Sequence, residues 1–295
     1  LPEDLRLTAT ALDPAWLGHV DSLARVLVVG SGLTALDIVS TLVRAGHRGG
    51  IVVMSRRGLR PRPQPPVVDP GDGSAPPRPL DRIMGDVPAF LLSAAAPPTL
   101  RAWVRALRER IREVEAGGES WHKGFDELRD VVWRAWPLLP AGEQRRFLRS
   151  MRTWYDVHRF RAPPQNDAMV RAAEARGAVE FRAARLRSVE AAAGQRTLRV
   201  RLAPRGGDDD RVESFDAVVN CTGLDAAAGV RANPFLASLV ADGALRVDSS
   251  GIGFAVDTNC RAIGADGRPN ASLRVVGPPK AGTFGDPLGV MFIVA

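Results

Sequence analysis

One stretch of the chain, residues 25–57, constrains the fold more than any other. It reads RVLVVGSGLTALDIVSTLVRAGHRGGIVVMSRR, in which a short apolar run is followed by a glycine turn, a stretch with apolar residues at helical spacing, and a second apolar run. Short runs of aliphatic and β-branched residues are typical of strands buried on both faces of a parallel sheet. The stretch therefore predicts a strand–turn–helix–strand unit, and with it a Rossmann-like α/β protein.

The turn formed by Gly30, Ser31 and Gly32 indicates a dinucleotide site. Gly30 permits the tight turn, Gly32 lets a pyrophosphate approach the backbone, and Ala35 lets the helix pack closely on the sheet. The free amides at the start of the helix, together with the positive end of its dipole, would bind the phosphates. The alternative is a turn that binds nothing; the strand patterns on both sides favour the dinucleotide site.

The end of the second apolar run indicates which nucleotide is bound. A site for NAD(H) places an acidic residue here, where it binds the ribose 2′-hydroxyl. This chain has Ser55, Arg56 and Arg57 instead, and no acid before Asp69. A guanidinium group binds a 2′-phosphate through two hydrogen bonds, whereas a carboxylate would repel it. We therefore expect NADP(H) to be preferred over NAD(H), unless the two arginines are ordinary surface charges in an arginine-rich chain.

Composition narrows the class of protein. The 295 residues suffice for one large domain or two small ones, and the formal net charge is +7. Almost all of the positive charge is arginine, since lysine occurs only at Lys123 and Lys280. Arginines scattered through an alanine-rich chain indicate compositional bias rather than a track for phosphates, so we do not expect nucleic-acid binding.

The two cysteines, Cys221 and Cys260, are far apart and have no metal-ligand spacing. They predict no metal site and fit a reduced, cytoplasmic setting. No apolar run approaches the ~20 residues of a membrane-spanning helix. The chain begins with Leu1 rather than Met, which suggests a piece of a longer protein.

Beyond the first unit the pattern alternates between loop, helices and strands. Residues 60–79 are rich in proline and read as a loop, and helices are expected at about 100–116, 125–136 and 141–155. Five of the six tryptophans fall between 103 and 154, either as the core of a small helical subdomain or as the lining of a pocket. We expect four parts: a lead-in segment (1–24), an NAD(P)-binding Rossmann-like domain (25–60 and 162–223), a proline-rich loop with a Trp-rich helical insertion (61–161), and the remnant of a flavin-type domain (224–295).

The second half of the chain offers two further candidate features. His158 lies in the run WYDVHRFR, where alternation would place Asp156 and His158 on one side, and it is a candidate for proton transfer or for a structural hydrogen bond. Strands are expected at 179–181, 185–190 and 197–202, which form a β-meander. The run DAVVNC reads as a buried strand that leads into Thr222 and Gly223, at the edge of the sheet where α/β proteins bind ligands.

The sequence resembles a known family at several points. The runs VLVVGSGLTALDIV, SRRG, WYDVHRFR, FDAVVNCTG and LRVVGPPKAGTF occur in the order seen in FAD/NAD(P)-binding flavoproteins of the two-dinucleotide-binding class. Within that class the chain resembles a poorly characterised bacterial FAD-NAD(P)-binding oxidoreductase-like group. Its glycine turn is also similar to that of flavin-dependent monooxygenases. The family's own flavin-binding glycine turn, which precedes the nucleotide domain, is absent from this chain, so we expect this chain alone to bind only the pyridine nucleotide.

The resemblance implies that NADPH reduces FAD, with an unknown small molecule as substrate. It also implies cofactor-binding roles by position. The pyrophosphate would contact Gly30, Ser31, Gly32, Leu33 and Thr34; the 2′-phosphate would contact Ser55, Arg56 and Arg57; Thr222 and Gly223 would lie where the two domains meet; and Gly277, Gly282 and Thr283 would close the flavin site.

Three functions remain open at this point. The first is an NADPH-dependent, FAD-containing oxidoreductase, monooxygenase-like, of which this chain is mainly the NADP(H)-binding domain. The second is a non-catalytic NADP(H)-binding sensor or scaffold, and the third is a basic protein that binds nucleic acid. The motifs favour the first. Apart from His158, no residue is a candidate for catalysis.

Overall fold

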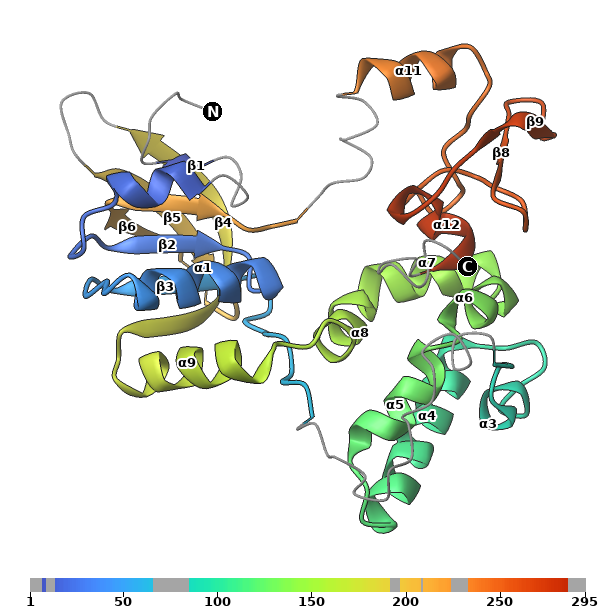
Figure 1. Ribbon diagram of the computed structural model, residues 1–295, viewed down its shortest axis with the longest axis horizontal. Coiled ribbons are helices and arrows are strands. Elements are labelled where there is room, and N and C mark those ends of the chain that lie inside the picture. The colour runs from blue at the N-terminus through green and yellow to red at the C-terminus, as the bar shows by residue number, and fades with distance from the viewer. Residues whose placement is uncertain are drawn as a thin grey trace, which may run out of the picture. The chain divides into compact units, whose positions relative to one another are not determined.

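The computed structural model describes residues 7–8, 14–65, 85–191, 197–207, 209–223 and 233–285. The chain divides into two compact units, one made of Leu1–Pro66 and Thr153–Gly223 and the other of Val67–Arg152 and Leu224–Ala295. Most of the expected proline-rich loop lies outside the described residues. The α/β, Rossmann-like fold with a helical insertion and a β-meander is confirmed (Figure 1).

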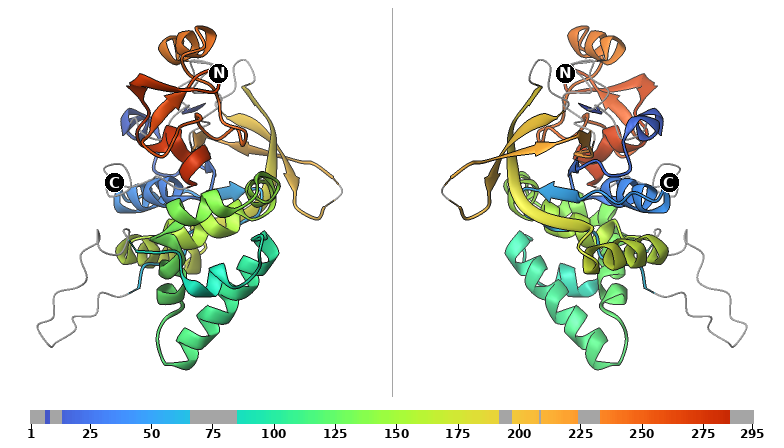
Figure 2. Two further views of the ribbon diagram at one scale, coloured as in Figure 1. Left: turned by 90° about the vertical axis from the view of Figure 1, so that its right-hand side faces the viewer. Right: turned by 90° about the vertical axis from the view of Figure 1, so that its left-hand side faces the viewer.

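A seven-stranded sheet forms the first unit, in the order β1-β7-β2-β3-β4-β5-β6. Its parallel part consists of β1 (Leu7–Thr8), β7 (Ala217–Asn220), β2 (Val26–Val29), β3 (Ile51–Ser55) and the start of β4 (Val179–Ala191). The rest of β4 pairs in antiparallel fashion with β5 (Leu198–Pro204), and β5 pairs with β6 (Arg211–Phe215). Figure 2 shows this meander, in yellow to orange, extending away from the parallel strands.

Both faces of the parallel strands are covered, which explains their continuous apolar sequences. Val26 and Val28 of β2 pack against helices α1 (Leu33–Arg44) and α9 (Pro164–Ala175). Leu27 points to the opposite face and packs with residues of β5 and β6. Because successive side chains of a strand alternate between faces, Val26, Leu27 and Val28 are buried on the two faces of the sheet, and Val29 is partly buried. The 3₁₀ helix η1 (Pro14–His19) contributes Trp16 to the helical face.

Helices make up the first part of the second unit: α3 (Ala89–Leu92), α4 (Leu100–Ala116), α5 (Trp121–Arg129), α6 (Val132–Ala135), η2 (Trp136–Leu138) and α7 (Ala141–Ser150). Thr99 caps α4, since its Oγ1 accepts a hydrogen bond from the Ala102 amide at 3.2 Å. Trp103 and Trp136 are buried in the core of this bundle, whereas Trp154 is 43% exposed. The tryptophans therefore do not share one role. The helix expected at 141–155 ends at Ser150, and α8 (Arg152–Arg159) follows it.

The second unit also contains the carboxyl-terminal part of the chain. It comprises α11 (Pro234–Ala241), the hairpin of β8 (Arg261–Ile263) and β9 (Pro269–Arg274), η3 (Pro278–Lys280) and α12 (Ala281–Phe284). The Trp136 Nε1 donates to the carbonyl of Gly282 at 2.9 Å and so joins the helices to this part. No helix within the described ranges is long and apolar enough to cross a membrane.

Candidate nucleotide-binding site

The glycine turn follows β2 at the carboxyl edge of the sheet. The Gly30 amide donates to the carbonyl of Met54 in β3 at 2.8 Å, and the Cys221 amide, after β7, donates to the carbonyl of Val29 at 2.7 Å. Gly30 has φ +112°, and a Cβ there would lie 2.2 Å from the carbonyl oxygen of Cys221. The obstructing atom belongs to the backbone, so it cannot move aside without disrupting the sheet. The fold itself requires glycine at position 30.

Gly32 differs from Gly30 in both backbone and surroundings. It has φ −79° and ψ −169°, an extended conformation that any residue can adopt. A Cβ at this position would meet no atom within 4 Å. Neither backbone strain nor packing therefore accounts for glycine here, and the space beside its Cα is open to a ligand.

The start of helix α1 presents unpaired hydrogen-bond donors beside this open space. Gly32 is the N-cap residue and has no side chain to accept hydrogen bonds, and the first turn of the helix has no acidic residue. Within the described ranges, the amides of Gly32, Leu33 and Thr34 donate to no protein acceptor. Unpaired amides at the positive end of a helix dipole form a site for an anion such as a phosphate. The donors that a pyrophosphate needs are thus in place.

The loop after β3 folds back beside the glycine turn. The Ser31 hydroxyl donates to the carbonyl of Leu59, and the Gly58 amide donates to Oγ of Ser55 at 3.0 Å. Arg56 is exposed and has no hydrogen bond or ion pair to any described residue, whereas Arg57 is half-buried and already has an interaction within the chain. Of the two arginines, Arg56 is the one whose guanidinium is available to a ligand.

The end of β7 completes the same edge of the sheet. The Thr222 amide and hydroxyl both donate to Oδ1 of Asn220, at 3.1 and 2.7 Å, and Gly223 has φ +83°. Burial raises the pKa of the Cys221 thiol to about 12, so this cysteine stays protonated and acts in packing. The structure therefore brings ten of the predicted cofactor-binding residues together at one edge of the sheet. Gly30 lies at the centre of this edge, and the other nine are Ser31, Gly32, Leu33, Thr34, Ser55, Arg56, Arg57, Thr222 and Gly223.

The three residues expected to close a flavin site lie in the other unit and have structural roles there. Gly277 precedes η3 with φ +74°. A Cβ on Gly282 would lie 2.0 Å from Cγ of Asp248, and the Thr283 hydroxyl donates to the carbonyl of Val256 at 3.3 Å. These contacts account for glycine and threonine at the three positions even when no ligand is bound. A role of these residues in flavin binding is implied by the family resemblance and stays a prediction.

His158 lies in helix α8, so the expected alternation of extended residues around it is wrong. Its Nδ1 is 2.7 Å from the carbonyl of Trp154, one turn earlier, and must donate because a carbonyl only accepts. Burial lowers the pKa of His158, the nearby charges of Arg62 and Arg161 lower it further, and the bond to the Trp154 carbonyl opposes both. The imidazole is therefore neutral at pH 7 and has a structural hydrogen bond; its role in catalysis stays a prediction.

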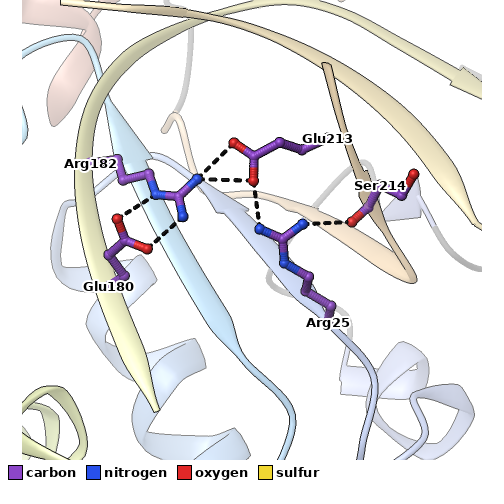
Figure 3. Close-up of polar contacts among 5 residues, drawn as sticks. All are labelled: Arg25, Glu180, Arg182, Glu213 and Ser214. Carbon is purple, nitrogen blue, oxygen red and sulfur yellow. Dashed lines mark hydrogen bonds and ion pairs between the residues drawn. The ribbon is translucent and has the colours of Figure 1, made fainter. Parts of the chain in front are cut away.

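A network of charged residues that connects Arg25, just before β2, with β4 and β6 was not predicted from the sequence (Figure 3). Arg182 of β4 binds Glu180 through two bonds of 2.6 and 2.5 Å, and it binds Glu213 of β6 at 2.8 and 3.0 Å. Arg25 binds the same Glu213 at 2.5 Å and the carbonyl of Ser214 at 2.9 Å. The network joins β4 and β6 of the meander to Arg25, the residue before β2. No local pattern could reveal it, because its members come from three distant segments.

A groove of about 620 Å³ lies on the second unit, along α4 and α7. Half of its ten lining residues are arginines, and none of the predicted site residues contributes to it. The arginines at helical spacing on α4, with one from α7, are Arg101, Arg105, Arg108, Arg112 and Arg146.

Comparison with known proteins finds solved structures with a similar fold. No protein-family model matches the sequence, and no curated protein matches it. An ornithine N-hydroxylase from Kutzneria sp. 744 is similar in structure, with 14% identity and a TM-score of 0.53 over 99% of this chain and 56% of its own. An L-lysine 6-monooxygenase from Pseudomonas syringae has 16% identity and a TM-score of 0.56 over 97% of this chain and 55% of its own.

A third similar structure is a cadaverine monooxygenase from Erwinia amylovora, solved with bound FAD. It has 12% identity and a TM-score of 0.56 over 99% of this chain and 53% of its own. The chain thus spans little more than half the length of each of these proteins. At such identities the likeness shows the fold, which is that of the corresponding part of these monooxygenases.

Proposed function

We propose that this chain is the NADP(H)-binding part of an FAD-dependent oxidoreductase of the monooxygenase type. The main support is the open space beside Gly32 under the unpaired amides of Gly32, Leu33 and Thr34. Arg56, on the loop beside this turn, is exposed and makes no ion pair with any described residue. The similar fold of three monooxygenases supports the wider assignment.

In this proposal each part of the site binds one part of the nucleotide. The amides at the start of α1 bind the pyrophosphate, and the Arg56 guanidinium binds the 2′-phosphate, with Ser55 and Arg57 beside it. When both cofactors are bound, NADPH supplies a hydride to the flavin. Thr222 and Gly223 border the nucleotide at the end of β7, while Gly277, Gly282 and Thr283 are retained as flavin-binding candidates.

The substrate is proposed to be a small molecule. The three similar proteins are named for ornithine, lysine and cadaverine, all small aliphatic amines, and this class is the first to test. The proposal also keeps the cytoplasmic setting and excludes nucleic acid and membranes as partners. The competing function, a non-catalytic NADP(H) sensor, predicts nucleotide binding without flavin in the full-length protein.

Two measurements test the proposal. Calorimetric titration of this chain with NADPH and NADH in one buffer is expected to show a preference for NADPH of about tenfold, ~1.4 kcal/mol, or more. Absence of binding by either nucleotide would contradict the site. The full-length protein is expected to show flavin absorbance. If it shows none after FAD is supplied, the non-catalytic NADP(H) sensor becomes the favoured function.

A further inference from the structure

The second unit places a lysine against a cysteine. Nζ of Lys280 lies 3.6 Å from Sγ of Cys260, and Lys280 is only 5% exposed. Cys260 is half-buried, in contrast to the fully buried Cys221. The two residues are 20 positions apart, and no sequence pattern had indicated their contact.

Among the described residues, no carboxylate pairs with this buried lysine. Among the described residues Lys280 forms no ion pair, and its other contact is with the ring of Phe284, whose centroid is 5.2 Å from Nζ. Asp257 is occupied by Arg261, whose Nε donates to it at 2.7 Å, and Asp248 accepts from the Gly253 amide at 2.7 Å. Buried lysines are ordinarily paired with an acid, so a lysine directed at a thiol requires another explanation.

The backbone holds the two side chains within this distance. The Phe254 amide donates to the carbonyl of Pro279 at 2.7 Å, which fixes the segment before Lys280. The Cys260 amide donates to the backbone carbonyl of Asp257 at 3.0 Å, and the Cys260 carbonyl accepts from the Val275 amide at 2.9 Å. Cys260 is also the one described non-glycine residue with a positive φ, at 58°. Both ends of the contact are thus positioned before any reaction.

We propose that Cys260 and Lys280 form a reversible covalent sulfur–nitrogen cross-link when the protein meets hydrogen peroxide. In the first step the Cys260 thiolate attacks one peroxide oxygen; an S–O bond forms, the O–O bond breaks, and the departing hydroxide takes up a proton to become water. In the second step the deprotonated Lys280 amine attacks the sulfur of the sulfenic acid; an S–N bond forms, the S–O bond breaks, and a second water leaves. The sulfur loses two electrons, and the peroxide is reduced to two waters.

The cross-link would join the residue before β8 to η3. The segment between them contains the β8–β9 hairpin, so the bond closes a loop around it and limits the freedom of the Pro278–Lys280 segment. Two thiol groups reverse the cross-link: the first attacks the Cys260 sulfur, which breaks the S–N bond, frees the Lys280 amine and leaves a mixed disulfide, and the second releases Cys260 as a disulfide forms between the two thiols. This part of the second unit would therefore respond to peroxide.

Mass spectrometry of the peroxide-treated chain tests the proposal. The wild-type chain is expected to become lighter by two hydrogen atoms and to yield a peptide linked through Cys260 and Lys280, which dithiothreitol separates. Cys221→Ser is the matched control, since Cys221 is buried without a lysine, and it should cross-link like the wild type. Cys260→Ser should form no link. Lys280→Arg should stop at a sulfenic acid that dimedone labels.

Two results would overturn the cross-link. The first is dimedone labelling of Cys260 to the same extent in the wild type and Lys280→Arg. The second is a linked peptide that contains Cys221 or Lys123, an exposed lysine paired with Glu119. Tryptic peptide mapping of the wild-type chain gives a further test without any variant. Trypsin cleaves after Lys280 only while the Lys280 amine is free. Full cleavage after Lys280 in the peroxide-treated chain would therefore also contradict the cross-link.

Discussion

The two units contain glycine motifs that look alike in sequence and differ in structure. In the second unit, a Cβ on Gly282 would lie 2.0 Å from Cγ of Asp248, and the carbonyl of Gly282 accepts from Trp136. In the first unit, Gly30 is likewise required by packing, but Gly32 has open space beside it. A glycine that the fold explains gives no information about a ligand. Gly32, which the fold does not explain, is the position that points to one.

The hydrogen-bonding groups of the two glycine motifs also differ. The amides of Gly32 and Leu33 are unpaired within the described part of the chain, whereas the Thr283 hydroxyl is bonded to Val256. The first motif therefore offers donors to a phosphate, and the second holds the unit together. Substitutions in each motif can separate these two roles.

Gly30→Ala should lower the free energy of unfolding by about 3 kcal/mol or more, because the methyl group meets the Cys221 carbonyl. Urea unfolding measures the loss. Gly46→Ala is the matched control: Gly46 has φ +76° with no atom within 4 Å of a Cβ, so it reports the cost of the left-handed backbone alone, about 1 kcal/mol. Equal losses for the two variants would show that the Cys221 contact is unimportant.

Gly32→Val should weaken binding of both NADPH and NADH at least a hundredfold, about 2.7 kcal/mol, by filling the space for the pyrophosphate. Its unfolding free energy should change by less than about 1 kcal/mol, because no protein atom obstructs the side chain. Calorimetry and urea unfolding of the same preparation provide both numbers. If the folded variant keeps its affinity for both nucleotides, the phosphates do not bind beside Gly32.

Gly282→Ala should destabilise the protein by about 2 kcal/mol, since the methyl group displaces the Asp248 carboxylate from its bonds to Ser250 and Gly253. Combining it with Asp248→Ala should cost less than the sum of the two single changes. Strict additivity in urea unfolding would show that Gly282 and Asp248 do not contact each other.

Arg56→Ala should weaken NADPH binding about tenfold, ~1.4 kcal/mol, and leave NADH unchanged, because only the 2′-phosphate loses its partner. Arg176→Ala is the control: Arg176 is also exposed and follows α9, near the amino ends of the strands. The role of Arg56 is disproved if both nucleotides weaken alike, and the site is misplaced if Arg176→Ala reproduces the effect.

The smallest expected effect is on acid stability. Hydrogen bonds from Arg182 lower the pKa of Glu180; burial raises the pKa of Glu213, but its bonds to Arg25 and Arg182 outweigh burial and lower it overall. A carboxyl group whose folded pKa lies below its unfolded value adds stability that is present above about pH 4.5 and is lost as the pH falls. Glu213→Gln should flatten this loss between about pH 5 and 3 by less than ~1 kcal/mol, since the network is partly exposed. An unchanged pH profile would show that the network contributes nothing measurable.

The sequence predicted the features that depend on neighbouring residues. The strand, the turn and the helix from Val26 to Arg44 follow from apolar spacing and from two glycines, and so does the position of the candidate nucleotide site. It could not predict contacts between distant residues, such as Asp248 with Gly282 or Lys280 with Cys260. The error at His158 has a local cause: an eight-residue helix with mixed polarity also fits an alternating pattern, and only its packing separates the two.

Nuclear magnetic resonance tests most directly whether the glycine turn binds the nucleotide. The chain is labelled with nitrogen-15 at glycine and leucine and is titrated with NADPH. We expect the amide signals of Gly32 and Leu33 to move most and to saturate together with binding, because these amides donate to the phosphates. NADPH binding that leaves both signals in place, while signals of the second unit move, would contradict the assignment of the site to the glycine turn.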